Sequence, residues 1–324
     1  MNRFFLFGVL LINFVAASNA KASCGSASCP LNGYRHLGSG RLEILLSHDY
    51  INQNRIYVGS SRSFVGALPN PHDEVQTIND RTALRLQYGI SDAFGVGLEV
   101  PYIYRYHKHI EDGEPETFNF SGLGDVAVTG QYAFDLSHED VDAMLSLILG
   151  AKLPTGVTNA KGTSGETAEV TIQPGTGSTD MLAGLNYHQG IATVPTIGGE
   201  YSSLPLTLGI LYQLNGKGTN DYQIGRTLMG HLGTEYQFTH SAYFLFQVNA
   251  MVRAKANVGS TDELPTNTGG TWIFASPGLR LEINDMLSAF TYFQLPVYQH
   301  VNGIQQGAPF YLQVGFSASV GLIE

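Results

Sequence analysis

The segment that most constrains the fold is the last one, residues 309–322, which reads PFYLQVGFSASVGL. Apolar side chains occupy every second position from Phe310 to Leu322, and the positions between them are mostly small or polar. Successive side chains of a β-strand point to opposite faces, so this segment would have one apolar and one polar face. Such a strand fits either a soluble β-sandwich or a membrane β-barrel whose apolar face meets lipid.

The composition favours strands over helices. The 324 residues include 38 glycines, 17 tyrosines and 17 phenylalanines, and only 14% of the residues are charged, which is typical of strands joined by turns. After the first segment, no run approaches the roughly 20 apolar residues that a membrane helix needs. The net charge of −10 argues against a nucleic-acid partner, which would require a basic surface.

Residues 1–20 have the pattern of a cleaved signal peptide. Arg3 precedes an apolar run over residues 4–15, and Ser18-Asn19-Ala20 forms a cleavage site of small residues. We therefore expect a mature chain that starts near Lys21 and is exported in a Gram-negative cell. The following segment, residues 21–40, would lie on the periplasmic side, as a plug in the lumen or as a leader.

Two cysteines, Cys24 and Cys29, follow the predicted cleavage site. In an oxidising compartment, the spacing predicts a small local disulfide. The alternative is a soft-metal site, for example for copper, that uses both thiolates.

Alternating segments recur along residues 41–324, and we count twelve of them. They are joined by connections that alternate between short and long; the long ones include residues 59–80, 107–116 and 154–176, while the connection at 189–203 is the hardest to place. An even number of strands with alternating turn lengths predicts a single antiparallel up-and-down transmembrane β-barrel. Pairing of the first and last strands would close it and leave no free edge.

Strand length and charge favour the membrane over the sandwich. Most segments have 10 to 14 residues, whereas sandwich strands average about 5 to 6 and spanning strands about 9 to 11. Many ionisable residues share the polar face, too many for a dry core, so we expect them to line a wet lumen. These predicted lumen residues are Arg85, Glu99, Arg105, Asp125, Lys152, Asp180, Glu235, Arg253, Lys255, Arg280 and Glu282.

Several short motifs resemble the bacterial outer-membrane family named after the MetA pathway of phenol degradation. They are SGLGDVAVTGQYAF (121–134), GAKLPTG (150–156), PGTGSTD (174–180), SPGL (276–279) and the pair Leu295-Pro296. The resemblance implies a barrel that transports hydrophobic or aromatic compounds. It also implies that Asp125, Lys152 and Asp180 are inward-facing charges at strand ends.

The lumen charges have two interpretations, a stiffening lattice of ion pairs or a filter for small polar solutes. His107 and His109 lie on the same side of an extended chain, and a solvated outer loop explains them better than a metal site. For catalysis on the outer wall, a serine and a histidine would have to share the apolar face, and we find no such pair; His231 and Glu235 fall on the lumen face. We therefore predict no catalytic residues, no metal and no cofactor.

The sequence thus predicts an outer-membrane channel of a Gram-negative cell for passive uptake of small aromatic or hydrophobic compounds. Residues 59–80 and 154–176 would act as gating loops. A structural or surface-interaction barrel with a plugged lumen is one alternative, and a copper- or redox-associated barrel acting through Cys24 and Cys29 is another. The expected partners are outer-membrane lipid, a small solute and the barrel-insertion machinery.

Overall fold

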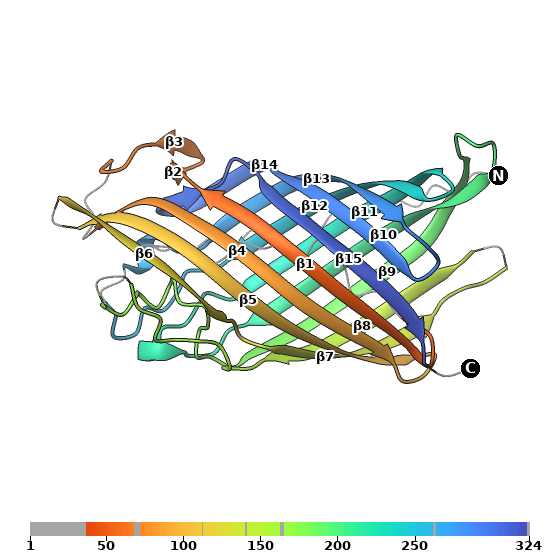
Figure 1. The fold of residues 1–324 in the computed structure, drawn as a ribbon, viewed down its shortest axis with the longest axis horizontal. Coiled ribbons are helices and arrows are strands. Elements are labelled where there is room, and N and C mark those ends of the chain that lie inside the picture. The colour runs from red at the N-terminus through yellow and green to blue at the C-terminus, as the bar shows by residue number, and fades with distance from the viewer. Residues whose placement is uncertain are drawn as a thin grey trace, which may run out of the picture.

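A computed structural model describes residues 37–67, 72–111, 113–139, 141–162, 165–261 and 264–322. They form one antiparallel sheet of fifteen strands, twelve of which follow one another around a closed barrel (Figure 1). Neither of the two short helices in this part of the chain, η1 (Thr219–Asp221) and η2 (Pro265–Asn267), is long and apolar enough to cross a membrane.

The barrel strands alternate in direction, and each pairs with its two neighbours. They are β1 (Arg41–Gln53), β4 (His72–Gly89), β5 (Phe94–Glu111), β7 (Ala127–Asp135), β8 (Ala143–Lys152), β9 (Asp180–Pro195), β10 (Tyr201–Leu214), β11 (Thr227–Thr239), β12 (Ala242–Arg253), β13 (Gly270–Glu282), β14 (Leu287–Gly307) and β15 (Tyr311–Gly321). Two further short strands, β2 (Arg55–Gly59) and β3 (Ser61–Ser63), extend the sheet beyond β14.

The first and last strands close the barrel. Arg41 of β1 lies opposite Gly321 of β15, and the register continues without interruption to Ile51 opposite Tyr311. The alternation in residues 309–322 therefore continues directly onto that of β1. As Figure 1 shows, the short turns and the C-terminal end of β15 lie at one end of the barrel, and the long loops lie at the other.

One barrel strand is interrupted at half height. The half of β5 nearer the long loops pairs with β6 (Glu114–Leu123), and the half nearer the short turns pairs with β7. Residues 124–126 between them leave the ladder opposite Pro101 of β5, whose ring nitrogen carries no hydrogen to donate. A backbone hydrogen bond of 2.9 Å, from the Gly124 amide to the Pro101 carbonyl, holds the strand at this point.

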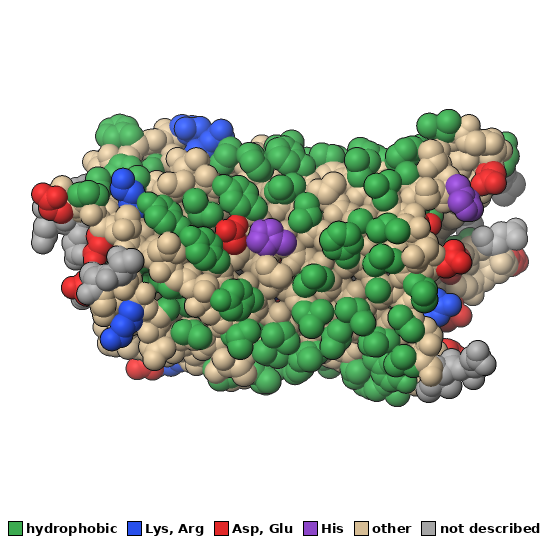
Figure 2. Space-filling model, viewed as in Figure 1, with side chains coloured by type: hydrophobic (Ala, Val, Ile, Leu, Met, Phe, Trp, Pro, Cys, Tyr) green, Lys and Arg blue, Asp and Glu red, His purple; other side chains and the backbone are tan. Residues whose placement is uncertain are grey.

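The outer surface of the barrel is apolar. Large hydrophobic side chains are exposed on all twelve strands, among them Leu46, Leu84, Leu98, Val128, Leu149, Leu185, Ile210, Leu232, Phe246, Leu279, Phe293 and Phe316. On the face of the barrel that Figure 2 shows, hydrophobic side chains cover the wall between the two ends, and the charged side chains gather mainly at the ends. Since such a surface is unfavourable in water, lipid is the solvent of this wall, as in outer-membrane barrels.

Several predicted loops prove to be strand. Residues 72–80 belong to β4, residues 107–111 to β5, and residues 114–116 to β6, so two of the predicted long loops are wrong over these ranges. The alternation fades there because the strands continue beyond the apolar belt, where the outward side chains meet water and can be polar on both faces. The strand ladder nevertheless continues, since His107 pairs with Thr77 and Phe118.

The connection at 189–203 is also corrected. β9 runs to Pro195 and β10 starts at Tyr201, which leaves a turn of residues 196–200. A register shift between Leu204 and Pro205 marks a bulge where proline cannot donate to the ladder. β14 likewise continues beyond the apolar belt, from Leu287 to Gly307.

Candidate functional site in the barrel interior

The inner wall carries a network of ion pairs at mid-height. Arg85 of β4 bonds Glu99 of β5 through Nε (2.9 Å) and Nη2 (2.6 Å). Arg81, four residues before Arg85 in β4, contacts Glu99 as well and donates a 3.2 Å hydrogen bond to Asp49 of β1. Gln313 of β15 donates to the other oxygen of Asp49 at 2.6 Å. The network therefore ties four neighbouring strands together.

A second network binds the long loops to the wall. Nζ of Lys152, at the end of β8, lies 2.7 Å from Asp125 and 3.1 Å from Asp180. Asp125 also accepts bonds from the backbone amides of Gly156 and Thr176, which are in the loop between β8 and β9. The interruption at residues 124–126 is what allows Asp125 to turn towards this loop.

A third network lies near the short-turn end. Arg280 of β13 makes a two-pronged contact with Glu235 of β11, at 2.8 and 3.2 Å. Its guanidinium also lies 4.1 Å from the ring centroid of Tyr243. The carboxylate of Glu282 is 3.8 Å from Nη2 of Arg280, which is farther than the carboxylate of Glu235. Lys255, in contrast, lies beyond the end of β12 and is exposed, so the structure does not bring it into any of these networks.

Arg105 of β5 differs from the paired cations. Its side chain is buried, with an exposed fraction of 3%, and Nη1 donates to the backbone oxygen of Gln173 at 3.3 Å. Within the part of the chain that the structure describes, its Nε has no hydrogen-bond partner and no carboxylate lies within ion-pair distance. Gln173 is itself held by Ala160 and Ala168, so Arg105 faces a well-anchored part of the β8–β9 loop.

Beside Arg105 lies a cavity of about 100 Å³ at the long-loop end of the lumen. Its walls come from strands and from the loops that follow β8, β10 and β12. The lining residues include Arg105, Arg253, Gln53, Gln305, Gln306, Thr176, Ser178, Tyr222, Trp272 and Tyr311. Five barrel strands separate β5 from β12 in either direction, so Arg105 and Arg253 line the cavity from opposite walls.

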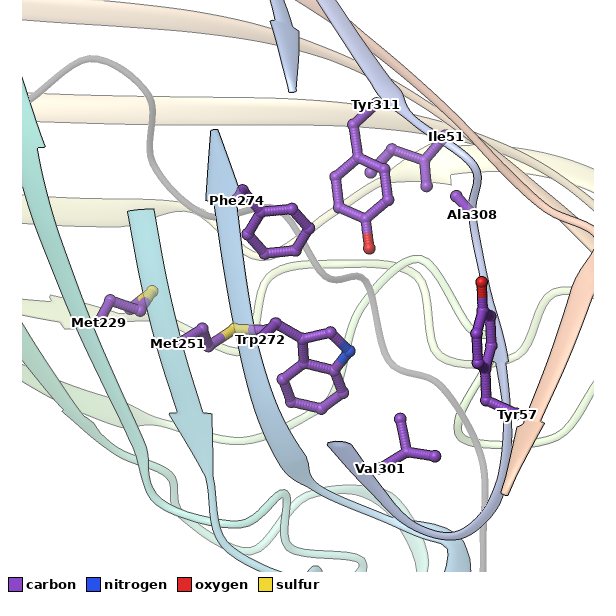
Figure 3. Packing of buried hydrophobic residues seen from close by; sticks show 9 residues of the cluster. All are labelled: Ile51, Tyr57, Met229, Met251, Trp272, Phe274, Val301, Ala308 and Tyr311. Carbon is purple, nitrogen blue, oxygen red and sulfur yellow. The ribbon is translucent and has the colours of Figure 1, made fainter. Parts of the chain in front are cut away.

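An apolar cluster adjoins this cavity on the inner wall (Figure 3). Trp272 and Phe274 of β13 pack there with Met251 and with Tyr311, whose ring centroid is 5.1 Å from that of Phe274. In Figure 3 the indole nitrogen of Trp272 points away from Met251 and towards the side of Tyr57. One side of the lumen is therefore aromatic. Insertion into the membrane does not require these inward-facing side chains, because the outward-facing side chains supply the apolar surface.

His107 and His109 are buried inside the barrel mouth rather than solvated, which corrects the prediction of an outer loop. His107 bonds the Thr77 hydroxyl at 2.9 Å, His109 lies 3.3 Å from Glu116, and both rings adjoin Phe118. In the described residues, no group of three or more His, Cys, Asp or Glu side chains is arranged to hold a metal ion. The two histidines instead join β5 to its neighbours on both sides.

A polar cluster interrupts the lipid-facing wall. His48 of β1 bonds Thr82 of β4 through Nδ1 at 3.0 Å, and its Nε2 lies 3.9 Å from Asp80. Their neighbours on this face include the exposed Leu46 and Leu84. The sequence analysis missed this cluster because it assigned residue 80 to a loop and did not place His48 on a face.

Other functional candidates were also missed. Asp49 of β1 and Arg81 of β4 lie on the lumen face, and Arg81 shares the strand parity of Arg85, so applying the lumen parity to every position of these two strands would have found them. Trp272 carried no local motif, and its place beside the cavity depends on the packing of distant strands. The predicted signal peptide, the segment before residue 37, Cys24 and Cys29 lie outside the described residues and remain predictions.

Solved structures with a similar fold are outer-membrane proteins. The COG4313 outer membrane channel from Pseudomonas putida F1 has a TM-score of 0.60 at 12% identity, covering 90% of this chain and 100% of that one. The transport unit of the autotransporter AIDA-I from Escherichia coli has a TM-score of 0.50 at 12% identity, covering 91% and 94%. No known protein-family profile and no curated protein matches the sequence. The chain thus has the fold of an outer-membrane β-barrel of Gram-negative bacteria.

Proposed function

We propose that this chain is a passive outer-membrane channel for small aromatic or otherwise hydrophobic compounds. The observation that supports it best is the cavity at the long-loop end, which is lined partly by Trp272, Tyr222 and Tyr311. Small-molecule sites combine apolar walls with a few polar groups that fix orientation. The resemblance of the Gly- and Pro-containing motifs to the phenol-degradation family points to the same class of compounds.

The ion-pair networks have a role in this proposal as well. They hold opposite charges on the inner wall, so the lumen is of mixed charge, and free diffusion as through a wide, open pore is disfavoured. Solutes would enter past the β8–β9 loop, which covers one side of the cavity and is held by Lys152 and Asp125. This loop contains the predicted gate at residues 154–176.

Liposome swelling tests the proposal. Liposomes that contain the refolded chain should swell faster than empty ones in isotonic benzamide, which is a single-ring aromatic solute. They should swell no faster than empty ones in a disaccharide of greater width. Equal swelling of empty and protein-containing liposomes in every solute would leave the plugged structural barrel as the better description.

A further inference from the structure

The cavity beside Arg105 is the one place in the described interior where a deeply buried cation lacks an acidic partner. Arg81, Arg85, Lys152 and Arg280 each contact a carboxylate. Arg105 is more deeply buried than any of these, and its contact in the described residues is a single backbone oxygen. An uncompensated buried guanidinium is unfavourable for folding, so its presence indicates a ligand that supplies the missing negative charge.

The surroundings of Arg105 favour an anion. None of the described residues that line the cavity is Asp or Glu, although acidic residues outnumber basic ones by 27 to 17 in the whole chain. Arg253 adds a second guanidinium from the opposite wall. Gln53 supplies an amide group that can donate hydrogen bonds to the same ligand, whereas the Gln305 amide already donates to the carbonyls of Gly269 and Asn302.

The other wall favours a ring. Trp272 and Tyr311 line the cavity, and both belong to the apolar cluster of Figure 3. Aromatic side chains make offset or edge-to-face contacts with a ligand ring, while an arginine binds a carboxylate through two parallel N–H groups. A molecule with a ring at one end and a carboxylate at the other would satisfy both walls at once.

We propose that this cavity is a binding site for small aromatic carboxylates, with the carboxylate on Arg105 and the ring beside Trp272. The proposal rests on the proposed channel function, because it names the class of solute that the channel would select. It can nevertheless be tested by binding alone. Binding without flux would retain the site and remove the channel, whereas flux without a preference for the carboxylate would retain the channel and remove the site.

The chain contains a single tryptophan, Trp272, so its fluorescence reports on this cavity. The detergent-solubilised chain would be titrated with benzoate and, separately, with benzamide, which has the same shape but no charge. Because a hydrogen bond to a charged group is stronger than one to a neutral group, benzoate should bind about tenfold more tightly. Equal affinities, or no response to benzoate, would overturn the proposal.

Arg105→Met separates the charge from the rest of the site. This variant should lose about tenfold in benzoate affinity while its benzamide affinity changes less than about twofold. Lys255→Gln is the matched control, because it removes one positive charge from an exposed position two residues beyond Arg253. It should bind benzoate like the unmodified chain; unchanged benzoate binding in Arg105→Met would contradict the proposal.

A second variant covers failure of Arg105→Met to fold, which heat-modifiable gel mobility would reveal. Arg253→Gln removes the cation on the opposite wall and retains a hydrogen-bonding side chain. It should reduce the ratio of benzamide to benzoate dissociation constants by at least about threefold. A ratio equal to that of the unmodified chain would overturn the assignment of this cavity to an anion.

Discussion

Arg85 and Glu99 lie directly opposite each other in the register of β4 and β5 and are joined by two hydrogen bonds, of 2.9 and 2.6 Å. Arg81 contacts the same carboxylate and extends the contact to Asp49 on the far side of β4. A single carboxylate thus holds two guanidinium groups on the inner wall, and the stability of this wall should depend on it.

Glu99→Gln tests that dependence. The amide is nearly the same size but leaves Arg85 and one side of Arg81 without a negative charge. We expect a loss of about 2 kcal/mol in the free energy of unfolding, between the values typical of exposed and of fully buried pairs. Urea unfolding of the refolded barrel in lipid measures it. Asp221→Asn is the matched control in an exposed pair with Lys217, and it should change stability by less than about 0.5 kcal/mol.

Arg105→Met should have the opposite effect on stability. Arg105 has no carboxylate partner among the described residues, so its replacement by an apolar side chain of similar length removes a desolvation cost. The free energy of unfolding should stay the same or rise by about 1 kcal/mol in the same urea experiment. A loss of stability as large as that of Glu99→Gln would mean that Arg105 is structural rather than a binding residue.

Gly156 holds the β8–β9 loop against the wall. A Cβ atom there would lie 2.6 Å from Cα of Gly175 and 2.7 Å from the carbonyl carbon of Gly124, both backbone atoms that cannot rotate away. Gly156→Ala should therefore displace the loop from the cavity and increase the ion conductance of the barrel. Gly198→Ala is the control, since its Cβ would meet only the Thr196 hydroxyl, at 3.8 Å, which is an ordinary contact. Equal conductance in the two variants would exclude the loop as a gate.

The polar cluster on the lipid-facing wall offers a double-mutant test. His48→Leu alone leaves Asp80 beside lipid without its imidazole partner, so the barrel should become less stable. His48→Leu combined with Asp80→Leu should recover that loss and gain about 1 kcal/mol over the unmodified chain, as replacement of ion pairs by apolar residues often does. If the double variant instead lost as much unfolding free energy as His48→Leu and Asp80→Leu lose together, the two side chains would not be coupled.

The strand pattern could be predicted from the sequence wherever lipid faces one side. The alternation in residues 309–322 and at Leu84, Leu86 and Tyr88 is strict, because the outward positions of these segments meet lipid and are apolar. Beyond the belt the constraint disappears, so residues 72–80, 107–111 and 114–116 were assigned to loops although they continue the ladder. The hydrogen bonds between strands are made by backbone groups, so the polarity of the side chains alone does not predict where a strand ends.

The candidate site could be predicted only in part. Strand parity predicts that Arg105 and Arg253 face the lumen. That they face each other across one cavity depends on which strands lie opposite each other in the closed barrel. Likewise, the sequence cannot distinguish Arg85, which is paired with Glu99, from Arg105, which has no carboxylate partner among the described residues, because both alternate with apolar neighbours. The difference arises from the inward path of the β8–β9 loop, which is fixed by contacts such as that of Gly156 with Asp125.

Single-channel recording in planar lipid bilayers tests the central claim most directly. If small solutes cross the membrane through the barrel interior, the unmodified chain should give discrete current steps in potassium chloride, and benzoate should reduce their amplitude while benzamide at the same concentration should not. Bilayers into which the folded barrel has inserted but which carry no current steps would contradict the account.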